Sequence, residues 1–235
     1  MASVFFVFSH CLAKYTDMPP TPQGTMPIPS ISLTLSTGNL MSIYLVRHGQ
    51  TEFNAVQRWQ GQVDSPLTEP GRQQAARVGH RLAAMTRTDE VHIFSSPLGR
   101  ARQTCEIIAG EMKIIDGITL DPGLMEVGMG AWDGMTDYEI DYEYPGMRNG
   151  LDRYEWFFHA PGGETFEKMT SRVARSLETI QQRQARDAII ICHGITSRLL
   201  RGVYANLPKE EALRLDVPQD AFFHLKDGDI ARIDC

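Results

Sequence analysis

Short apolar runs alternate with amphipathic stretches along the chain from residue 41 onward. Strand-length apolar runs occur at residues 41–46, 91–95, 118–120, 189–191, 221–225 and 230–233. Apolar residues at helical spacing predict helices over about 69–85, 96–111, 164–183 and 209–214, and another from about residue 196. Alternating strands and helices are typical of an α/β domain. We therefore expect a three-layer sandwich, with a mostly parallel central sheet and helices on both faces.

Local signals mark some of the element ends. Thr68 precedes Glu69 and Pro70, which is the pattern of an N-cap followed by proline in the first helical turn. Asp227 and Gly228 lie between the last two apolar runs and predict a hairpin. The chain should therefore close with an antiparallel pair of strands.

Two segments depart from this alternation. Residues 1–40 begin with a short apolar burst and continue with a stretch rich in Pro, Thr, Ser and Gly. Two alternatives are that this segment contains a signal peptide or that Met41 is the true initiator. We expect a disordered extension that takes no part in the chemistry. Residues 132–160 are rich in aromatics and predict a lid or a small helical subdomain, in which most aromatics pack inward. The domain itself should span residues 41–235.

Composition narrows the function classes. The formal net charge of −6 argues against nucleic acid and anionic membranes as partners. No apolar stretch reaches the length of a membrane span. The four cysteines are scattered without paired spacing, which argues against a zinc site and a disulfide framework. We therefore expect a cytoplasmic protein.

Nitrogen-rich side chains follow several predicted strands. Arg47 and His48 end the first strand, Arg100 follows the second at the start of a helix, and His193 ends the run at 189–191. Ligands bind at the carboxyl edge of open α/β sheets, so these residues should meet there. Arginine suits phosphate because its planar fork carries a permanent charge. The pattern predicts an anion site that would favour a phosphate group.

Five motifs in order extend this prediction. They are Arg47-His48-Gly49-Gln50-Thr51, Ser96-Pro97-Leu98 with Arg100-Ala101 and Gln103-Thr104, Glu126 with Gly130 and Trp132-Asp133-Gly134, Pro161-Gly162-Gly163-Glu164, and His193-Gly194. Together they resemble the histidine phosphatase superfamily, in its phosphoglycerate-mutase-like branch. The resemblance runs from about residue 42 to the C-terminus.

The resemblance implies a role for each matching residue. His48 would be the nucleophile that becomes phosphorylated, and Glu126 would be the proton donor. The phosphoryl oxygens would be held by Arg47, Arg100 and His193. Substrate binding is expected from Asn54, Gln60 and Gly61. The family chemistry implies no metal ion and no cofactor.

Three functions remain open at this point. Hydrolysis of a small phosphomonoester is favoured, because the Trp59-Gln60-Gly61 segment resembles phosphatase-type members and the basic insertion of the mutases is missing. Mutase-type phosphoryl transfer is the first alternative. A non-catalytic phosphate-binding or protein-interaction module is the second. The substrate is not named by the sequence, and a homodimer is the oligomer considered.

Overall fold

The computed structural model describes residues 41–183 and 187–235, so every prediction made for residues 1–40 lies outside the described residues. Within these described residues, six strands and seven α-helices follow one another. Their bounds are β1 Ser42–Arg47, α1 Glu52–Ala55, α2 Glu69–Met85, β2 Val91–Ser95, α3 Gly99–Met112, β3 Ile118–Leu120, α4 Asp137–Glu143, α5 Phe166–Gln181, β4 Asp187–Cys192, α6 Gly194–Tyr204, α7 Lys209–Arg214, β5 Ala221–Lys226 and β6 Asp229–Asp234.

The strands form one sheet in the order β3-β2-β4-β1-β5-β6. The pairs β2–β3, β2–β4 and β1–β4 are parallel, whereas β1–β5 and β5–β6 are antiparallel. β1 and β4 lie next to each other, and Arg47 pairs with Cys192 in their register. His48 and His193 therefore leave the sheet at the same edge.

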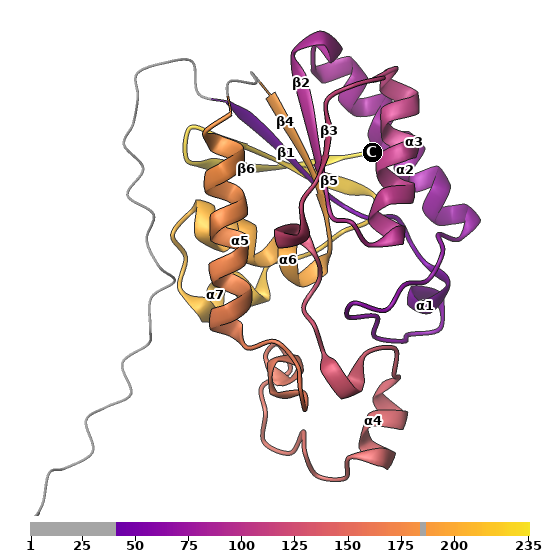
Figure 1. The fold of residues 1–235 in the computed structure, drawn as a ribbon, viewed down its shortest axis with the longest axis vertical. Coiled ribbons are helices and arrows are strands. Elements are labelled where there is room, and N and C mark those ends of the chain that lie inside the picture. The colour runs from indigo at the N-terminus through magenta and orange to yellow at the C-terminus, as the bar shows by residue number, and fades with distance from the viewer. Residues whose placement is uncertain (1–40, 184–186) are drawn as a thin grey trace, which may run out of the picture.

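Helices cover both faces of the sheet, as predicted (Figure 1). α2 and α3 pack on one face, and α5, α6 and α7 pack on the other. Alternation along β1 sends Tyr44 and Val46 to the first core and Ile43 and Leu45 to the second. The three-layer α/β sandwich with a mostly parallel sheet is confirmed.

Two predicted helix starts are wrong by a few residues. α3 begins at Gly99 instead of residue 96, and α6 begins at Gly194 instead of about 196. Neither N-cap residue, Leu98 or His193, makes a side-chain cap hydrogen bond. By contrast, Thr68 caps α2 as predicted, because its side chain accepts a hydrogen bond from the Gly71 amide.

The aromatic segment contains α4, which lies below the sheet in Figure 1. Trp132, Trp156 and Phe157 are buried among other rings. Tyr138 and Tyr142 instead face solvent, each 76% exposed, so the expectation of inward packing does not extend to them. None of the helices in the described residues is long and apolar enough to cross a membrane.

Candidate active site

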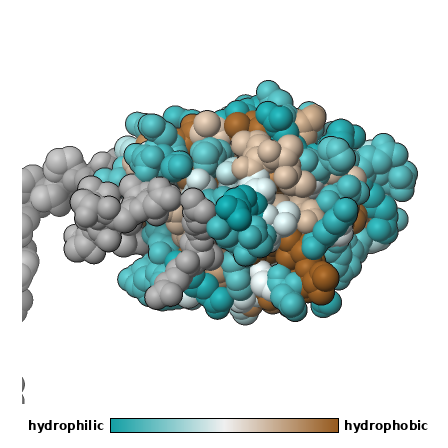
Figure 2. Space-filling model, turned by 90° about the horizontal axis from the view of Figure 1, so that it is seen from above, coloured by the Kyte–Doolittle hydropathy of each residue, from teal (hydrophilic) through white to brown (hydrophobic). Residues whose placement is uncertain are grey.

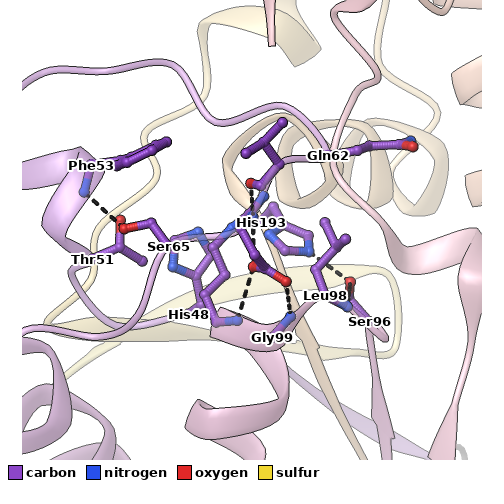
Figure 3. A network of polar contacts seen from close by, with 12 residues as sticks. His48, Thr51, Phe53, Gln62, Ser65, Ser96, Leu98, Gly99 and His193 are labelled. Carbon is purple, nitrogen blue, oxygen red and sulfur yellow. Dashed lines mark hydrogen bonds and ion pairs between the residues drawn. The ribbon is translucent and has the colours of Figure 1, made fainter. Parts of the chain in front are cut away.

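A cavity of about 250 Å³ opens where β1 and β4 end. Seven residues predicted for the site line it: Arg47, His48, Asn54, Gln60, Gly61, Arg100 and Glu126. The eighth, His193, is fully buried and is not part of the wall. Its ring lies behind that of His48, with the two ring centroids 5.1 Å apart (Figure 3).

The His48 ring is held in one tautomer. Its Nδ1 lies 2.8 Å from the carbonyl oxygen of Gly49. A carbonyl oxygen only accepts hydrogen bonds, so Nδ1 carries the proton and Nε2 keeps its lone pair. Burial and the positive charges of Arg100 and Arg47 hold the pKa of His48 well below its usual value. The ring is therefore neutral at pH 7, with a free lone pair on Nε2.

The glycine after His48 is required by a close approach of two chain segments. A Cβ on Gly49 would lie 2.2 Å from the carbonyl oxygen of Gly71 in α2. The Gly49 amide donates a hydrogen bond to the Thr104 hydroxyl at 3.2 Å. The bend after β1 is thereby fixed against α2 and α3, and with it the position of His48.

The His193 ring is held by a serine that directly follows the neighbouring strand β2. Its Nε2 lies 2.7 Å from the Ser96 hydroxyl, and the Ser96 oxygen accepts a hydrogen bond from the Leu98 amide (Figure 3). Burial, and the charges of Arg100, His48 and Arg47, keep the pKa of His193 well below its usual value. The opposite ring nitrogen, Nδ1, is buried without a partner.

Arg100 is almost fully buried, with 1% of its surface exposed. Its terminal nitrogens donate hydrogen bonds to backbone carbonyls of Gly61 and Val63 and form an ion pair with Asp64. Asp64 also accepts hydrogen bonds from the amides of Gly99 and Arg100. The Asp64 carboxylate therefore supplies the cap that Leu98 does not provide, and it fixes Arg100 at the same time.

Four site residues contain a buried polar atom that no protein group satisfies. Among the described residues, seven buried side-chain nitrogen or oxygen atoms lack a hydrogen-bond partner. Four of the seven are Arg47 Nε, Arg100 Nε, His193 Nδ1 and Gln60 Oε1. Unsatisfied buried polar atoms are rare because each costs free energy. Their concentration here indicates a site built for a polar ligand.

Glu126 lies on the other side of the cavity and closes the N-terminus of α6. Its carboxylate accepts hydrogen bonds from the amides of Ile195 and Thr196, each at 3.2 Å, and from the Thr196 hydroxyl. Negative charge is favourable at a helix N-terminus. This contact explains why α6 can begin directly after His193 without a capping side chain.

The predicted substrate-binding residues take different positions. Asn54 uses its side-chain oxygen to accept hydrogen bonds from the Thr51 amide and from Gln219. Gln60 is buried, with its Oε1 unpaired. Gly61 contributes its backbone, which has a φ of +52° and leaves no room for a Cβ beside Asp133. Gln60 Oε1 is therefore free for a ligand, and so is Asn54 Nδ2, which makes no hydrogen bond to the described residues.

Sequence reasoning missed two arginines of the site. Arg198, from the second turn of α6, lines the cavity. Arg172, from α5, donates hydrogen bonds to the carbonyls of Gly123, Met125 and Glu126 and pairs with Glu164. Arg198 follows His193 by five residues, and that spacing on a helix could have indicated it. No local signal singles out Arg172.

The carboxylates are not grouped as metal ligands usually are. Within residues 41–183 and 187–235, no cluster of three or more His, Cys, Asp or Glu side chains could hold a metal ion. Two acids of the site, Asp64 and Glu126, are engaged with helix N-termini.

Comparisons with known proteins identify the family of the chain. A sequence model of the histidine phosphatase superfamily, branch 1, matches residues 43–226. A protein of Salmonella choleraesuis named probable phosphoglycerate mutase GpmB is 36% identical over 196 residues, which cover 83% of this chain and 85% of the relative.

Solved structures add two further neighbours. YhfR of Bacillus stearothermophilus superposes with a TM-score of 0.68 at 30% identity, covering 81% of this chain and 94% of its own. A mycobacterial glucosyl-3-phosphoglycerate phosphatase, solved with VO3, gives a TM-score of 0.66 at 26% identity, covering 79% and 91%. The family match spans most of the chain and the ordered motifs all fall inside it. The chain is therefore an enzyme of the histidine phosphatase superfamily, in branch 1.

Proposed function

We propose that the enzyme hydrolyses the phosphomonoester of a small metabolite, without a metal ion, through a phosphohistidine on His48. The four unsatisfied buried atoms around His48 are the observation that carries this proposal. Three of them are nitrogens from Arg47, Arg100 and His193. In our proposal the Nε–H groups of the two arginines, which line the cavity, donate to phosphoryl oxygens. Phosphoryl transfer depends mainly on positioning and on neutralising charge over those oxygens.

In the first step, the Nε2 lone pair of His48 attacks phosphorus and the ester P–O bond breaks. The leaving oxygen takes a proton from Glu126, giving the free alcohol and an ionised carboxylate. In the second step, Glu126 removes a proton from water, and the water oxygen forms a bond to phosphorus as the P–N bond breaks. Inorganic phosphate leaves, and both His48 and Glu126 return to their starting states.

Gln60 favours hydrolysis over retention of the phosphoryl group. Its side-chain oxygen Oε1 is buried at the cavity wall without a donor. In our proposal it accepts a hydrogen bond from the attacking water and orients it. The neighbour solved with VO3 is named a phosphatase, which supports the same choice.

The test measures hydrolysis of 4-nitrophenyl phosphate with and without EDTA, together with vanadate inhibition. Wild-type activity should persist in EDTA and be inhibited by vanadate. His48→Ala should lower kcat/KM by roughly 1,000-fold or more, because the nucleophile is lost. Mass spectrometry of quenched wild-type enzyme should find one phosphoryl group on the peptide that contains His48. Full activity in His48→Ala would refute the mechanism.

Mutase-type transfer is the alternative, favoured by the name of the Salmonella relative. A panel of phosphate esters, assayed with and without 2,3-bisphosphoglycerate, separates the two reactions. Release of inorganic phosphate independent of 2,3-bisphosphoglycerate indicates hydrolysis, whereas isomerised ester that depends on it indicates transfer. Phosphate binding with no turnover of any ester would indicate the non-catalytic module.

We also infer that the partner is a small phosphorylated molecule in the cytoplasm, not nucleic acid or a membrane. The net charge of −6 supports this because it repels anionic polymers and surfaces. Binding of a labelled DNA or RNA oligonucleotide at physiological salt would contradict it.

A further inference from the structure

Residues 215–220 connect α7 to β5, and the first five of them, residues 215–219, are here called the strap. Three successive carbonyls of the strap each accept a hydrogen bond from an arginine. The donors and acceptors are Arg198 and Leu215 at 2.7 Å, Arg201 and Asp216, and Arg47 and Val217 at 2.6 Å. These contacts attach the strap both to α6 and to the end of β1, so its path beside the site is fixed.

Gln219 ends the strap and donates two hydrogen bonds to the site. Its Nε2 lies 3.2 Å from the His48 carbonyl oxygen and 3.2 Å from the side-chain oxygen Oδ1 of Asn54. A carbonyl oxygen only accepts hydrogen bonds, so the NH₂ end of the Gln219 amide must face His48. The two contacts use both hydrogens of this NH₂ group. One amide group thus joins the backbone of His48 to the side chain of Asn54.

The Asn54 amide is oriented by two donors. Its Oδ1 accepts hydrogen bonds from the Thr51 amide, at 3.2 Å, and from Gln219. Neither group can accept a hydrogen bond, so both contacts require Oδ1, and not Nδ2, to face them. The Nδ2 group makes no hydrogen bond to the described residues, and Asn54 lines the same cavity as His48. Nδ2 is therefore the end of the amide that is left to donate to a ligand.

The two donors on Asn54 have different origins. Thr51 is a local partner, because it and Asn54 form the capping box of α1, a helix of only four residues. So short a helix has little stability of its own. Gln219 comes from 165 positions away and is attached through the strap to α6 and β1. Its contact therefore fixes Asn54 relative to His48, which the capping box alone does not do.

We propose that Gln219 is a positioning residue for phosphate binding, because it holds the Asn54 amide with Nδ2 toward the ligand. The inference rests on the function proposed above, in which a phosphoryl group binds beside His48. Ionised phosphoryl oxygens accept hydrogen bonds and do not donate them, so only this orientation of the Asn54 amide suits them. The reverse orientation would present Oδ1 to a negative charge.

The test measures calorimetric binding of inorganic phosphate to wild type, Gln219→Met and Gln219→Glu. Methionine has a similar length and no donor, so the Kd for phosphate should rise by roughly 10-fold, the scale of one lost hydrogen bond. Ionised glutamate has only acceptors at that position. It should favour the reverse orientation of Asn54 and raise the Kd further than methionine does. Phosphate binding as tight as in wild type in either folded variant would overturn the inference.

A double-mutant cycle with Asn54→Ala separates positioning from a general structural role. If Gln219 acts through Asn54, Gln219→Met should raise the Kd by no more than about 2-fold once the Asn54 amide is absent. A purely structural role would weaken phosphate binding equally in both backgrounds. Equal losses would therefore overturn the positioning role of Gln219.

Gln73→Met is the matched control. Gln73 is exposed on α2, and its Nε2 donates a hydrogen bond to the Glu69 side chain at 3.1 Å. Its substitution removes a glutamine hydrogen bond away from the cavity wall and should leave the Kd for phosphate unchanged. Circular dichroism and thermal unfolding show whether each variant is folded before its binding is compared.

Phosphate binding requires no turnover, so the outcome is independent of the proposed hydrolysis. Wild-type enzyme that binds phosphate but hydrolyses no ester would refute the hydrolysis, and the double-mutant cycle would still support positioning by Gln219. Conversely, equal losses in the cycle together with hydrolysis of 4-nitrophenyl phosphate by wild type would overturn the positioning role and leave the hydrolysis proposal intact.

Discussion

Side-chain atoms without partners carry most of the functional information at the scale of single residues. Arg47 keeps its Nε–H group free while its Nη1 donates to the Val217 carbonyl. Arg100 keeps its Nε–H group free while both of its Nη atoms bond to the protein. His48 keeps one ring nitrogen free because the other bonds to Gly49. The protein thus uses part of each side chain to hold it still and leaves the remaining part for a ligand.

Glu126→Gln should reveal the proton donor through the leaving group. We expect kcat/KM to fall by roughly 100-fold or more for an alkyl phosphate, because its alkoxide needs a proton as it leaves. The loss should be much smaller for 4-nitrophenyl phosphate, whose leaving group is stable without one. Glu106→Gln, at an exposed position on α3, is the control. Equal losses across a series of esters would exclude this role.

At the scale of elements, the helices nearest the site depend on distant carboxylates. Asp64 caps α3 and Glu126 caps α6. Both helix starts were predicted a few residues away from their observed positions. A cap supplied by a residue 36 or 69 positions away gives no signal in the sequence beside the helix. The same contacts place Arg100 and Glu126 at the cavity.

Arg172 should act as a positioning residue for Glu126. The Arg172 and Glu164 side chains are each 16% exposed and form two contacts of 2.7 Å. Arg172→Met would remove the ion pair of Glu164 and one hydrogen bond to each of three carbonyls between Gly123 and Glu126, so the free energy of unfolding should fall by about 3 kcal/mol or more.

The activity of Arg172→Met separates positioning from a purely structural role. The loss of kcat/KM should depend on the leaving group in the same direction as in Glu126→Gln, because the displaced group is the proton donor. Arg175→Met is the control, at an exposed position three residues after Arg172 on α5. It should change the free energy of unfolding by no more than about 0.5 kcal/mol. A folded Arg172→Met enzyme with unaltered leaving-group dependence would count against positioning.

At the scale of the whole molecule, the chemistry is concentrated at one end. The carboxyl ends of the parallel strands face α1 and α4 in Figure 1. The opposite end, seen from above in Figure 2, is mainly hydrophilic with only limited hydrophobic areas. The site is cationic, although the formal net charge of the chain is −6. This contrast would concentrate anionic ligands at that end of the molecule.

Buried neutral histidines should make the fold sensitive to mild acid. The pKa values of His48 and His193 are held well below 6.5 in the folded protein, so the unfolded chain binds protons first as the pH falls. The stabilising contribution is present above pH 6.5 and is lost below it. When the pH falls from 7.5 to 5.5, each of the two histidines should lower the free energy of unfolding by about 1 kcal/mol.

Denaturant unfolding in phosphate-free buffer at the two pH values measures this loss. His48→Ala should reduce the difference between pH 7.5 and 5.5 by about 1 kcal/mol. An unaltered difference in His48→Ala would show that His48 is not held neutral in the folded state.

The sequence by itself determined the α/β class, the order of the strands and of five of the seven helices described, and the family. Periodic burial is a property of neighbouring residues, and the motifs around His48, Arg100 and His193 are short and ordered along the chain. It also predicted which residues meet at the sheet edge, because strands that are parallel neighbours end together.

Only the tertiary structure decided which atoms of those residues are free. The unpaired nitrogens of Arg47 and Arg100, the burial of His193 behind His48 and the presence of Arg198 in the cavity wall all depend on contacts between distant segments. A hydrogen bond from Arg47 to Val217 spans 170 positions, so no local pattern encodes it. The residue types indicate phosphate chemistry, whereas the path of the chain determines what surrounds the phosphate.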